Sequence, residues 1–262
     1  MIPVLFAARE GYTDVLDFCA CVGGNVSVVD SDRNNILHLT SLGGHVPMVK
    51  YIVSQNITDI NSRDRFRRTP VMLAAAEGHT DVFVFLVSKG GKASLVDTYK
   101  NNVLHLASLR GHLDMVTHIL SQNIVDINGR ERYGRTPLMS AATGGNVDVF
   151  RSLVSEGSNA SLVDRFGDNI LHLASLSGHV DLVGYILSQN ITDINSRGSF
   201  KRTPLMNTAR GHVEMVKHIL QGSGVGLEAT NEYGWTPRMY AQKRNKTELI
   251  HYLNAINGTG SG

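Results

Sequence analysis

A chain of 262 residues with 42% hydrophobic residues is long enough for one large or two smaller domains with a sizeable core. Its net charge is only +2, and 18% of its residues are charged, so the overall balance favours neither nucleic acid nor a membrane surface as partner. No apolar run is long enough to cross a bilayer, which argues against membrane insertion. The two cysteines, Cys19 and Cys21, lie too close together for a disulfide framework, which favours a reducing, intracellular compartment.

One segment occurs three times at equal intervals along the chain. Its copies begin at Asn35, Asn102 and Asn169, and the third reads NILHLASLSGHVDLVGYILSQNITDIN. A related unit lies between successive copies, so that helix-start signals recur with a nearly constant spacing. A short fixed period of this kind predicts a solenoid, in which each unit buries its apolar face against its neighbours. The repeats are predicted to start near residues 2, 35, 69, 102, 136, 169, 203 and 236.

Each repeat predicts two short helices and then a loop. The first helix begins at a Thr-Pro pair, as at Thr69, or at an asparagine, as at Asn102, because these residues suit a helix start. A glycine ends this helix, and the second helix has an acid near the positive end of its dipole, as at Asp81. The second helix ends at a residue that tolerates left-handed geometry, such as Gly90 or Asn123. We expect the following loop to form a protruding hairpin.

The segments TPLMSAATGGNVDVFRSLVSEG and ILHLASLSGHVDLVGYILSQN resemble the ankyrin repeat, whose pattern is roughly G-x-TPLH-x-AA-xx-GH-xx-IV-xx-LL-xx-GAD-x-N. The resemblance covers Ile2 to about Leu253. It implies an all-α ankyrin-repeat solenoid of stacked helix–turn–helix units, curved, with first helices on the concave face and hairpin loops along one edge. The family's glycine two residues before each cap is replaced at four tips, where a different turn type is expected. The replacing residues are Arg33, Arg67, Lys100 and Lys201.

The ends of the chain carry further expectations. The ankyrin-repeat domain is predicted to cover residues 1–257, and residues 258–262 to be a disordered tail or a remnant of cloning. The first repeat is too apolar for the end of a stack, which leads to the hypothesis that the chain belongs to a longer array or has lost a preceding unit. In the seventh repeat the stretch from Thr203 to Gly211 is one residue short, so an irregularity is expected there.

Eleven histidines raise the question of a metal or catalytic site. Their positions argue against one, because they recur after the turn glycine, as at His79, and at the fourth position of a repeat, as at His105. None has a cysteine or a zinc-ligand spacing beside it, and no catalytic motif occurs. The resemblance to ankyrin repeats implies that these histidines form hydrogen bonds between helices and hairpins. We therefore expect no enzyme, no cofactor, no metal and no small-molecule substrate.

An aromatic residue stands three positions before the cap at six of the seven junctions between repeats. Because packed helices lie about 8–10 Å apart, the rings are expected to form a ladder along one edge. In ankyrin-like proteins this position commonly contacts the partner, and aromatic residues are frequent interface hot spots. The alternative is that each ring packs on the next hairpin and only stabilises the stack. These tip aromatics are Phe66, Tyr99, Tyr133, Phe166, Phe200 and Tyr233.

The loops that end the second, fourth and sixth repeats are basic, with net charges of +3, +2 and +3. A basic edge that carries aromatics favours an acidic protein or peptide, since arginine pairs with carboxylates in bidentate geometry. Nucleic acid is a weaker alternative, because such surfaces also stack bases, and solvated turn charges are the simplest explanation. The arginines predicted to bind the partner are Arg65, Arg68, Arg132, Arg135 and Arg202.

Three asparagines close the same loops, each in the sequence Asp-Ile-Asn. The stretches LSQNIVDIN and LSQNITDIN, which end at Asn128 and Asn195, resemble the sites at which ankyrin-repeat proteins are hydroxylated by an asparaginyl hydroxylase. In the copy that ends at Asn61, Val53 replaces the leucine. The alternative is that each asparagine only hydrogen-bonds the hairpin backbone.

These patterns together predict a non-catalytic protein–protein interaction scaffold, monomeric and located in the cytoplasm or nucleus. A partner protein or peptide of acidic character would bind on the concave face and the hairpin tips. One alternative is an ankyrin arm that recruits substrates to, or tethers, a larger enzyme or channel. Another is a purely structural spacer, which would bury the tip aromatics against one another.

Overall fold

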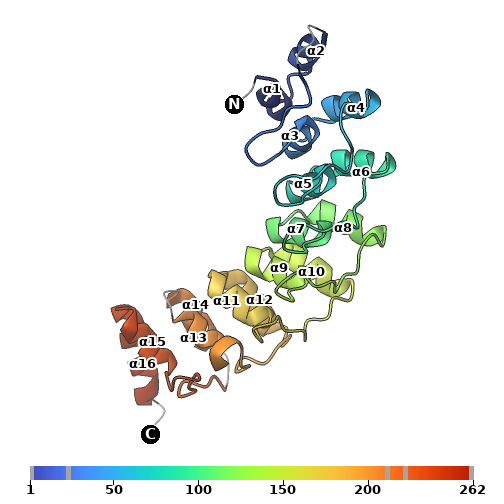
Figure 1. Cartoon of the computed structure of the whole chain (residues 1–262). Helices are drawn as coiled ribbons and strands as arrows, with labels where there is room; N and C mark the ends of the chain where they lie inside the picture. Colours follow the sequence, from blue (N-terminus) through green and yellow to red (C-terminus); the bar gives the residue numbers. More distant parts are fainter. Residues whose placement is uncertain (1–2, 22–24, 210–212, 221–223, 260–262) are drawn as a thin grey trace. The chain divides into compact units, whose positions relative to one another are not determined.

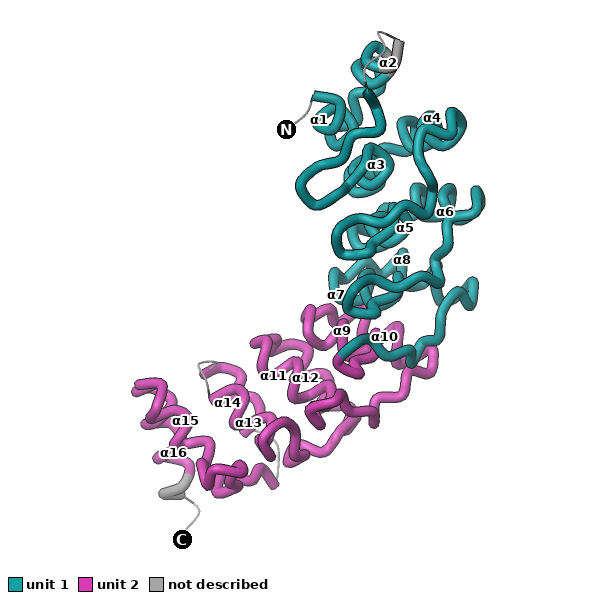
Figure 2. The backbone as a smooth tube through the Cα atoms, viewed as in Figure 1, with its two compact units in different colours: residues 1–132 teal, residues 133–262 magenta. Residues whose placement is uncertain are grey.

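The computed structural model describes residues 3–21, 25–209, 213–220 and 224–259, and these described residues form sixteen α-helices and one 3₁₀-helix, with no strand (Figure 1). This confirms the predicted all-α architecture. The chain divides into two compact units, residues 1–132 and 133–262, which Figure 2 shows in different colours. Each unit contains four successive helix pairs, one pair for each predicted repeat.

Unit 1 holds the first four helix pairs. Its first helices pack against one another from repeat to repeat, with α1 against α3, α3 against α5 and α5 against α7. Its second helices form a parallel row of contacts, α4 with α6 and α6 with α8. The bounds are α1 Pro3–Glu10, α2 Thr13–Cys21, α3 Ile36–Gly43, α4 Val46–Ser54, α5 Pro70–Ala76, α6 Thr80–Ser88, α7 Val103–Arg110 and α8 Leu113–Ser121.

Unit 2 repeats this arrangement. Helices α9, α11, α13 and α15 pack in sequence as first helices, and α10, α12, α14 and α16 pack in sequence as second helices. The bounds are α9 Pro137–Gly144, α10 Val147–Ser155, α11 Ile170–Ser177, α12 Val180–Ser188, η1 Ser199–Lys201, α13 Pro204–Thr208, α14 Val213–Leu220, α15 Pro237–Lys243 and α16 Thr247–Thr259.

The first helices begin at the predicted cap residues. In repeats two, four and six an asparagine is the cap, and Asn102 Oδ1 accepts hydrogen bonds from the backbone N–H groups of Leu104 and His105, both at 3.1 Å. In later odd-numbered repeats a threonine hydroxyl does the same, as when Thr69 Oγ1 accepts from the N–H of Met72 at 3.3 Å. These bonds satisfy N–H groups that have no partner inside the helix. The confirmed caps are Asn35, Thr69, Asn102, Thr136, Asn169, Thr203 and Thr236.

Asparagine caps also fasten a first helix to the loop that ends the same repeat. The Nδ2 group of Asn35 donates to Thr58 Oγ1 at 2.7 Å and to Ser62 Oγ at 2.9 Å. In the sixth repeat Asn169 makes the same two bonds, to Thr192 and Ser196, both at 2.8 Å. A threonine cap has no amide and cannot donate in this way, and in the Asn-capped fourth repeat Val125 and Gly129 replace the two hydroxyl residues.

Where a histidine follows the turn glycine, it holds neighbouring repeats together, as at His45, His79, His112 and His179. The Nε2 atom of His79 lies 3.0 Å from the backbone carbonyl oxygen of Leu42, and that of His112 lies 2.9 Å from the carbonyl oxygen of Ala76. Both partners belong to the preceding repeat. The rings also lie against the turn glycines: a Cβ atom added to Gly78 would come within 2.5 Å of the His112 ring. The predicted structural role is confirmed here, and His212 lies outside the described residues.

Three of the four unusual hairpin tips keep the backbone of the glycine-containing ones. Arg33, Arg67 and Lys100 have φ values of 64°, 62° and 64°, close to the 80° and 83° of Gly134 and Gly167. The expectation of a different turn type is therefore wrong at these three tips. The reason lies in the tip itself, where an i to i+4 backbone bond and an aspartate side chain fix the turn and offset the strain of a non-glycine residue.

The seventh repeat is irregular, as predicted. At the tip that leads into it, both Phe200 and Lys201 have positive φ, 57° and 56°, and lie in the 3₁₀-helix η1. Its first helix, α13, has only five residues, and the rest of the short stretch falls on residues 210–212, outside the described part.

The C-terminal helix runs further than expected. Gly258 and Thr259 belong to α16, so the predicted tail boundary at residue 258 needs correction; residues 260–262 lie outside the described residues. A glycine disfavours a helix by only about 1 kcal/mol, and no proline stops this one. None of the described helices is both long and apolar enough to cross a bilayer.

The first repeat leaves apolar side chains exposed where later repeats bury them. Val15 on α2 is 42% exposed, whereas Met48 and Val82, at the same position of α4 and α6, are fully buried. Phe6 on α1 is 46% exposed, and its counterpart Leu39 on α3 is 5% exposed. The first helix of each later repeat in unit 1 packs against the first helix before it.

Candidate functional site

The predicted tip aromatics are held at the ends of tightly closed turns. At the second tip, Asp64 Oδ1 accepts hydrogen bonds from the N–H groups of Phe66 and Arg68, at 2.8 and 2.7 Å. Asp97, Asp164 and Asn231 play the same part at other tips. The rings at these four tips therefore stand on a fixed backbone. All six tip aromatics remain exposed, by 36 to 61%: Phe66, Tyr99, Tyr133, Phe166, Phe200 and Tyr233.

Backbone hydrogen bonds join several of the tips to the next one within a unit. In unit 1 the carbonyl of Phe66 accepts from Thr98 at 2.8 Å, and that of Tyr99 accepts from Arg132 at 2.7 Å. In unit 2 the carbonyl of Tyr133 accepts from Arg165 at 2.8 Å. The spacing of these aromatics along each unit is thus set by main-chain bonds.

The rings of unit 2 also touch one another in pairs. Tyr133 and Phe166 stack with centroids 6.1 Å apart and planes at 30°, and Phe200 and Tyr233 lie 6.2 Å apart at 31°. These four rings therefore pack on one another and still remain partly exposed to solvent. Their contact with a partner stays a prediction.

Three of the five predicted arginines are engaged within the fold. Arg68 Nε donates to Asp64 Oδ2 at 2.7 Å, and Arg135 Nε donates to Asp164 Oδ2 at 3.2 Å. Both carboxylates are fully buried, so these ion pairs stabilise the tips. Arg202 instead donates from Nε to the hydroxyl of Tyr240 at 3.0 Å.

The other two arginines project from the surface. The side chain of Arg65 is 65% exposed and lies 3.7 Å from Asp32, which is a weak surface pairing. Arg132 is likewise exposed. Arg63, which also contributes to the positive charge of this loop, has a structural role. Its Nη1 atom donates to the carbonyls of Arg67 and Val96, at 3.2 and 3.0 Å, and so joins one tip to the next.

Two of the loop asparagines use both groups of their side chains. Asn195 donates to the carbonyl of Gly224 at 2.7 Å and accepts from the N–H of Gly226 at 2.8 Å. Asn61 makes the same pair of bonds at the end of the second repeat. At Asn128 the backbone N–H donates to Asp126 Oδ1 at 2.9 Å. The predicted structural bonding is present at Asn61 and Asn195.

Burial changes the ionisation of two first-helix histidines. It lowers the pKa of His38 and of His172, because the charged ring would lose its hydration. Each ring sits between the cap asparagine and a backbone carbonyl: His172 Nδ1 is 2.6 Å from Asn169 Oδ1, and its Nε2 is 3.0 Å from the carbonyl oxygen of Arg202.

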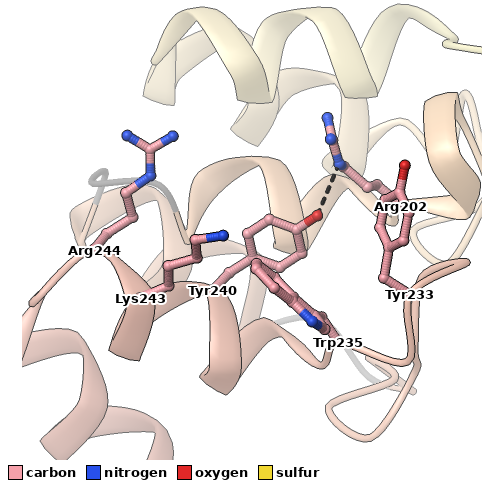
Figure 3. A pocket seen from close by; sticks show the side chains of 6 residues that line it. All are labelled: Arg202, Tyr233, Trp235, Tyr240, Lys243 and Arg244. Carbon is pink, nitrogen blue, oxygen red and sulfur yellow. Dashed lines mark hydrogen bonds between the residues drawn. The ribbon is translucent and has the colours of Figure 1, made fainter.

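Sequence reasoning missed a pocket in unit 2. It has a volume of about 590 Å³ and lies between the last two tips and helix α15 (Figure 3). A signal was present, because Trp235, the only tryptophan, comes just before α15, whose sequence PRMYAQK combines an arginine, a tyrosine and a lysine. We call it the C-terminal pocket, lined by Arg202, Tyr233, Trp235, Tyr240, Lys243 and Arg244.

These features define a helical repeat protein: its helix pairs are stacked and capped, histidines link the repeats, and hydrogen bonds order the hairpin tips along one edge. The family model for ankyrin repeats (three copies) matches residues 4–97, 56–131, 104–198 and 171–259. The chain therefore belongs to the ankyrin-repeat family.

Known proteins with similar sequences include much longer ones. A Caenorhabditis elegans homolog of transient receptor potential cation channel subfamily A member 1 is 28% identical over 64% of this chain and 14% of its own length. Neurogenic locus notch homolog protein 1 of Xenopus laevis is 27% identical over 95% of the chain and 10% of its own length. The phosphocholine transferase AnkX of Legionella pneumophila is 26% identical over 62% of the chain and 17% of its own length. The chain thus matches less than a fifth of each of these relatives.

Proposed function

We propose that this chain is a non-catalytic binding module for an acidic partner protein or peptide, which lies along the first helices and hairpin tips. The supporting observation is that the tip aromatics are about half exposed and yet held in hydrogen-bonded turns. Ordered rings lose little conformational freedom on binding, and aromatic residues are the commonest interface hot spots.

The acidic character of the partner follows from the exposed arginines. Arg65 and Arg132 stand beside Phe66 and Tyr133 with their guanidinium groups in solvent, where they can attract carboxylates during encounter. Arg68 and Arg135 already pair with buried acids, so we assign them to the fold rather than to the partner.

Capture from a cell lysate with the intact chain tests this proposal, followed by affinity measurement on the captured protein. Changing Phe66, Tyr99 and Tyr133 together to Ala should weaken binding about 100-fold or more, as expected for several hot spots. Phe18→Ala removes an aromatic that is 66% exposed on α2, away from the tips, and serves as the control. Affinity that stays within twofold in the triple variant would show that the proposed face is wrong.

The second candidate function is an ankyrin arm of a larger enzyme or channel. It is favoured by the relatives, which include proteins named as a cation channel and a transferase and of which the chain matches only a small part. An antibody against this chain would decide between the two in extracts of the source cells. A band near 28.6 kDa supports an independent module, and a much larger band supports the arm. We assign the module to the cytoplasm or nucleus as a monomer, which light scattering and cell fractionation would check.

We also propose that Asn128 and Asn195 are substrates of an asparaginyl hydroxylase. Since both side-chain groups of Asn195 are hydrogen-bonded to the next repeat, its loop must open locally before an enzyme can reach the Cβ atom. Peptide mass spectrometry after incubation with such an enzyme should show one added oxygen on the peptides that hold these residues. Unmodified peptides after complete turnover of a reference substrate would dismiss the idea.

A further inference from the structure

The C-terminal pocket carries three cations and no acid among its lining residues. Arg202 enters from the tip before α13, and Lys243 and Arg244 come from the end of α15 and the residue after it (Figure 3). Among the described residues none of these three forms an ion pair with a carboxylate. The nearest acid in sequence, Glu232, forms a hydrogen bond with the Tyr233 side chain and thereby raises the pKa of that tyrosine.

Arg202 differs from its counterparts because two acids have been replaced. Arg68 pairs with the aspartate that opens its own tip, and Arg135 pairs with the aspartate that opens the next one. At Arg202 the first of these positions is Gly198 and the second is Asn231. The guanidinium group therefore keeps an uncompensated charge at a place where the repeat elsewhere neutralises it.

Aromatic groups hold these cations in place and form the pocket walls. Arg202 lies with its Cζ atom 4.6 Å from the ring centre of Phe200, and Lys243 Nζ lies 4.2 Å from the ring centre of Trp235. Trp235 and Tyr240 meet edge to face at 5.3 Å. Tyr240 already accepts hydrogen bonds from Arg202 and Asn231, at 3.0 and 2.9 Å, so its own hydroxyl hydrogen is left to donate to a ligand.

We propose that the C-terminal pocket binds a glutamate or aspartate side chain of the partner together with an adjacent aromatic residue. The carboxylate pairs with the Nη groups of Arg202 and with Lys243, while the neighbouring ring packs against Trp235 and Tyr233. A volume of about 590 Å³ exceeds the space that one carboxylate needs and lies in the range of sites for small organic groups. This inference rests on the proposed function, since it specifies which residues of an acidic partner are recognised.

The single tryptophan of the chain lines this pocket, so its fluorescence reports directly on occupancy. We would titrate the full chain with a capped peptide containing Glu-Phe-Glu and with matched peptides containing Gln-Phe-Gln or Glu-Ala-Glu. The Glu-Phe-Glu peptide should give a saturable change and bind about tenfold tighter than either control, because each control lacks one of the two proposed contacts. Arg202→Gln should abolish this preference for acid, and Lys243→Gln should weaken it without affecting the fold, since Lys243 is exposed.

Several outcomes would overturn the proposal: no saturable change up to millimolar Glu-Phe-Glu, equal binding of the Gln-Phe-Gln peptide, or equal binding of inorganic phosphate alone. Arg110→Gln, which removes an exposed arginine at the end of α7, controls for net charge. The two proposals fail separately. If the tryptophan responds to the peptide but the Phe66, Tyr99 and Tyr133 variant still binds the partner, only the tip face is contradicted. If the tryptophan does not respond but that variant loses the partner, only the pocket is contradicted.

Discussion

Asp164 shows how one buried carboxylate organises a whole hairpin tip. Its Oδ1 atom accepts from the N–H groups of Phe166 and Asp168, at 2.9 and 3.0 Å, and its Oδ2 atom accepts from Arg135. Its side chain is fully buried, so none of these bonds is exchanged readily with water. The aromatic at the tip is consequently positioned by a residue two places before it.

Changing Asp164 to Ala should lower the free energy of unfolding by about 2–4 kcal/mol, because two backbone N–H groups and one guanidinium lose their acceptor. Asp164→Asn should cost clearly less, since Asn231 already fills the same role at the last tip, where its Oδ1 accepts two N–H bonds at 2.9 Å. Urea unfolding of the three proteins measures the difference. Equal stability of the wild type and the Ala variant would mean that the tip does not depend on this side chain.

The buried histidines predict how stability responds to acid. Burial lowers the folded-state pKa of His38 and His172 from the ordinary value of 6.5, so the unfolded chain takes up protons first as the pH falls. Their contribution is fully present above pH 6.5 and is lost as the pH falls from there towards the lower folded-state pKa. Urea unfolding at about pH 7.5 and 5.5 should therefore show a loss at the lower pH.

Replacing both histidines by glutamine, which cannot take up a proton, should reduce that loss. Replacing His251 by glutamine gives the matched control, because this histidine in α16 is exposed rather than buried. An identical pH response in the double variant and the wild type would contradict the assignment. The charged neighbours of these rings are Asp64 and Arg68 at His38 and Asp168 and Asp164 at His172; the double variant removes their interaction with the imidazolium together with the burial effect.

At the scale of the helices, the turn glycines serve two purposes that a pair of variants can separate. Gly78 has a φ of 75°, and an added Cβ would meet the His112 ring at 2.5 Å. Gly90, which follows α6, has a φ of 96° with nothing within 4 Å. A side chain at either position would be strained by the positive φ. Only at Gly78 would it also displace the ring of His112, which links two repeats.

We expect Gly90→Ala to cost about 1 kcal/mol of stability, from the backbone conformation alone. Gly78→Ala should cost at least about 1–2 kcal/mol more, since the His112 ring must move and its 2.9 Å contact with the Ala76 carbonyl is strained. Thermal unfolding of both variants measures the difference. Equal costs would show that the histidine ring moves away without penalty.

The helix elements were predictable because their signals are local. Cap residues such as Asn102 and Thr69 and the left-handed ends at Gly90 and Asn123 act within a few positions, and the structure places helix boundaries beside them. The C-terminal pocket was not predictable in the same way. It is built from side chains of two tips and a helix. It also depends on the absence of an aspartate at Gly198, which the repeat pattern does not mark.

The arginines show the same limit. Arg68, Arg135 and Arg202 occupy one position of the repeat, and local patterns assign all three the same partner-binding role. The structure pairs the first with its own tip, the second with the next tip and the third with a tyrosine. The partners of Arg135 and Arg202 lie in the following repeat, beyond the reach of local patterns.

At the scale of the molecule, stability comes from contacts between successive repeats. Val15 and Val82 are the same residue at the same place in the repeat, but the first is 42% exposed and the second is fully buried. Val82→Ala should lower the free energy of unfolding by about 1–3 kcal/mol, whereas Val15→Ala should change it by less than about 0.5 kcal/mol. Urea unfolding gives both values. A large cost at Val15 would mean that its side chain is covered in solution.

The asparagine caps have a consequence for how such a chain changes over evolutionary time. Asn35 and Asn169 make the same bonds to their own loops, whereas Val125 and Gly129 replace the two hydroxyl residues in the loop that follows Asn102. The asparagine cap itself returns at every second repeat from Asn35 to Asn169. Loss of residues 102–168 would place Asn169 where Asn102 now stands, and duplication of that block would be equally seamless. Gain or loss of a single repeat would instead bring two repeats with the same kind of cap together. Recombination would therefore lengthen or shorten the row of hairpin tips two at a time, which couples the history of the gene to the length of the proposed binding face.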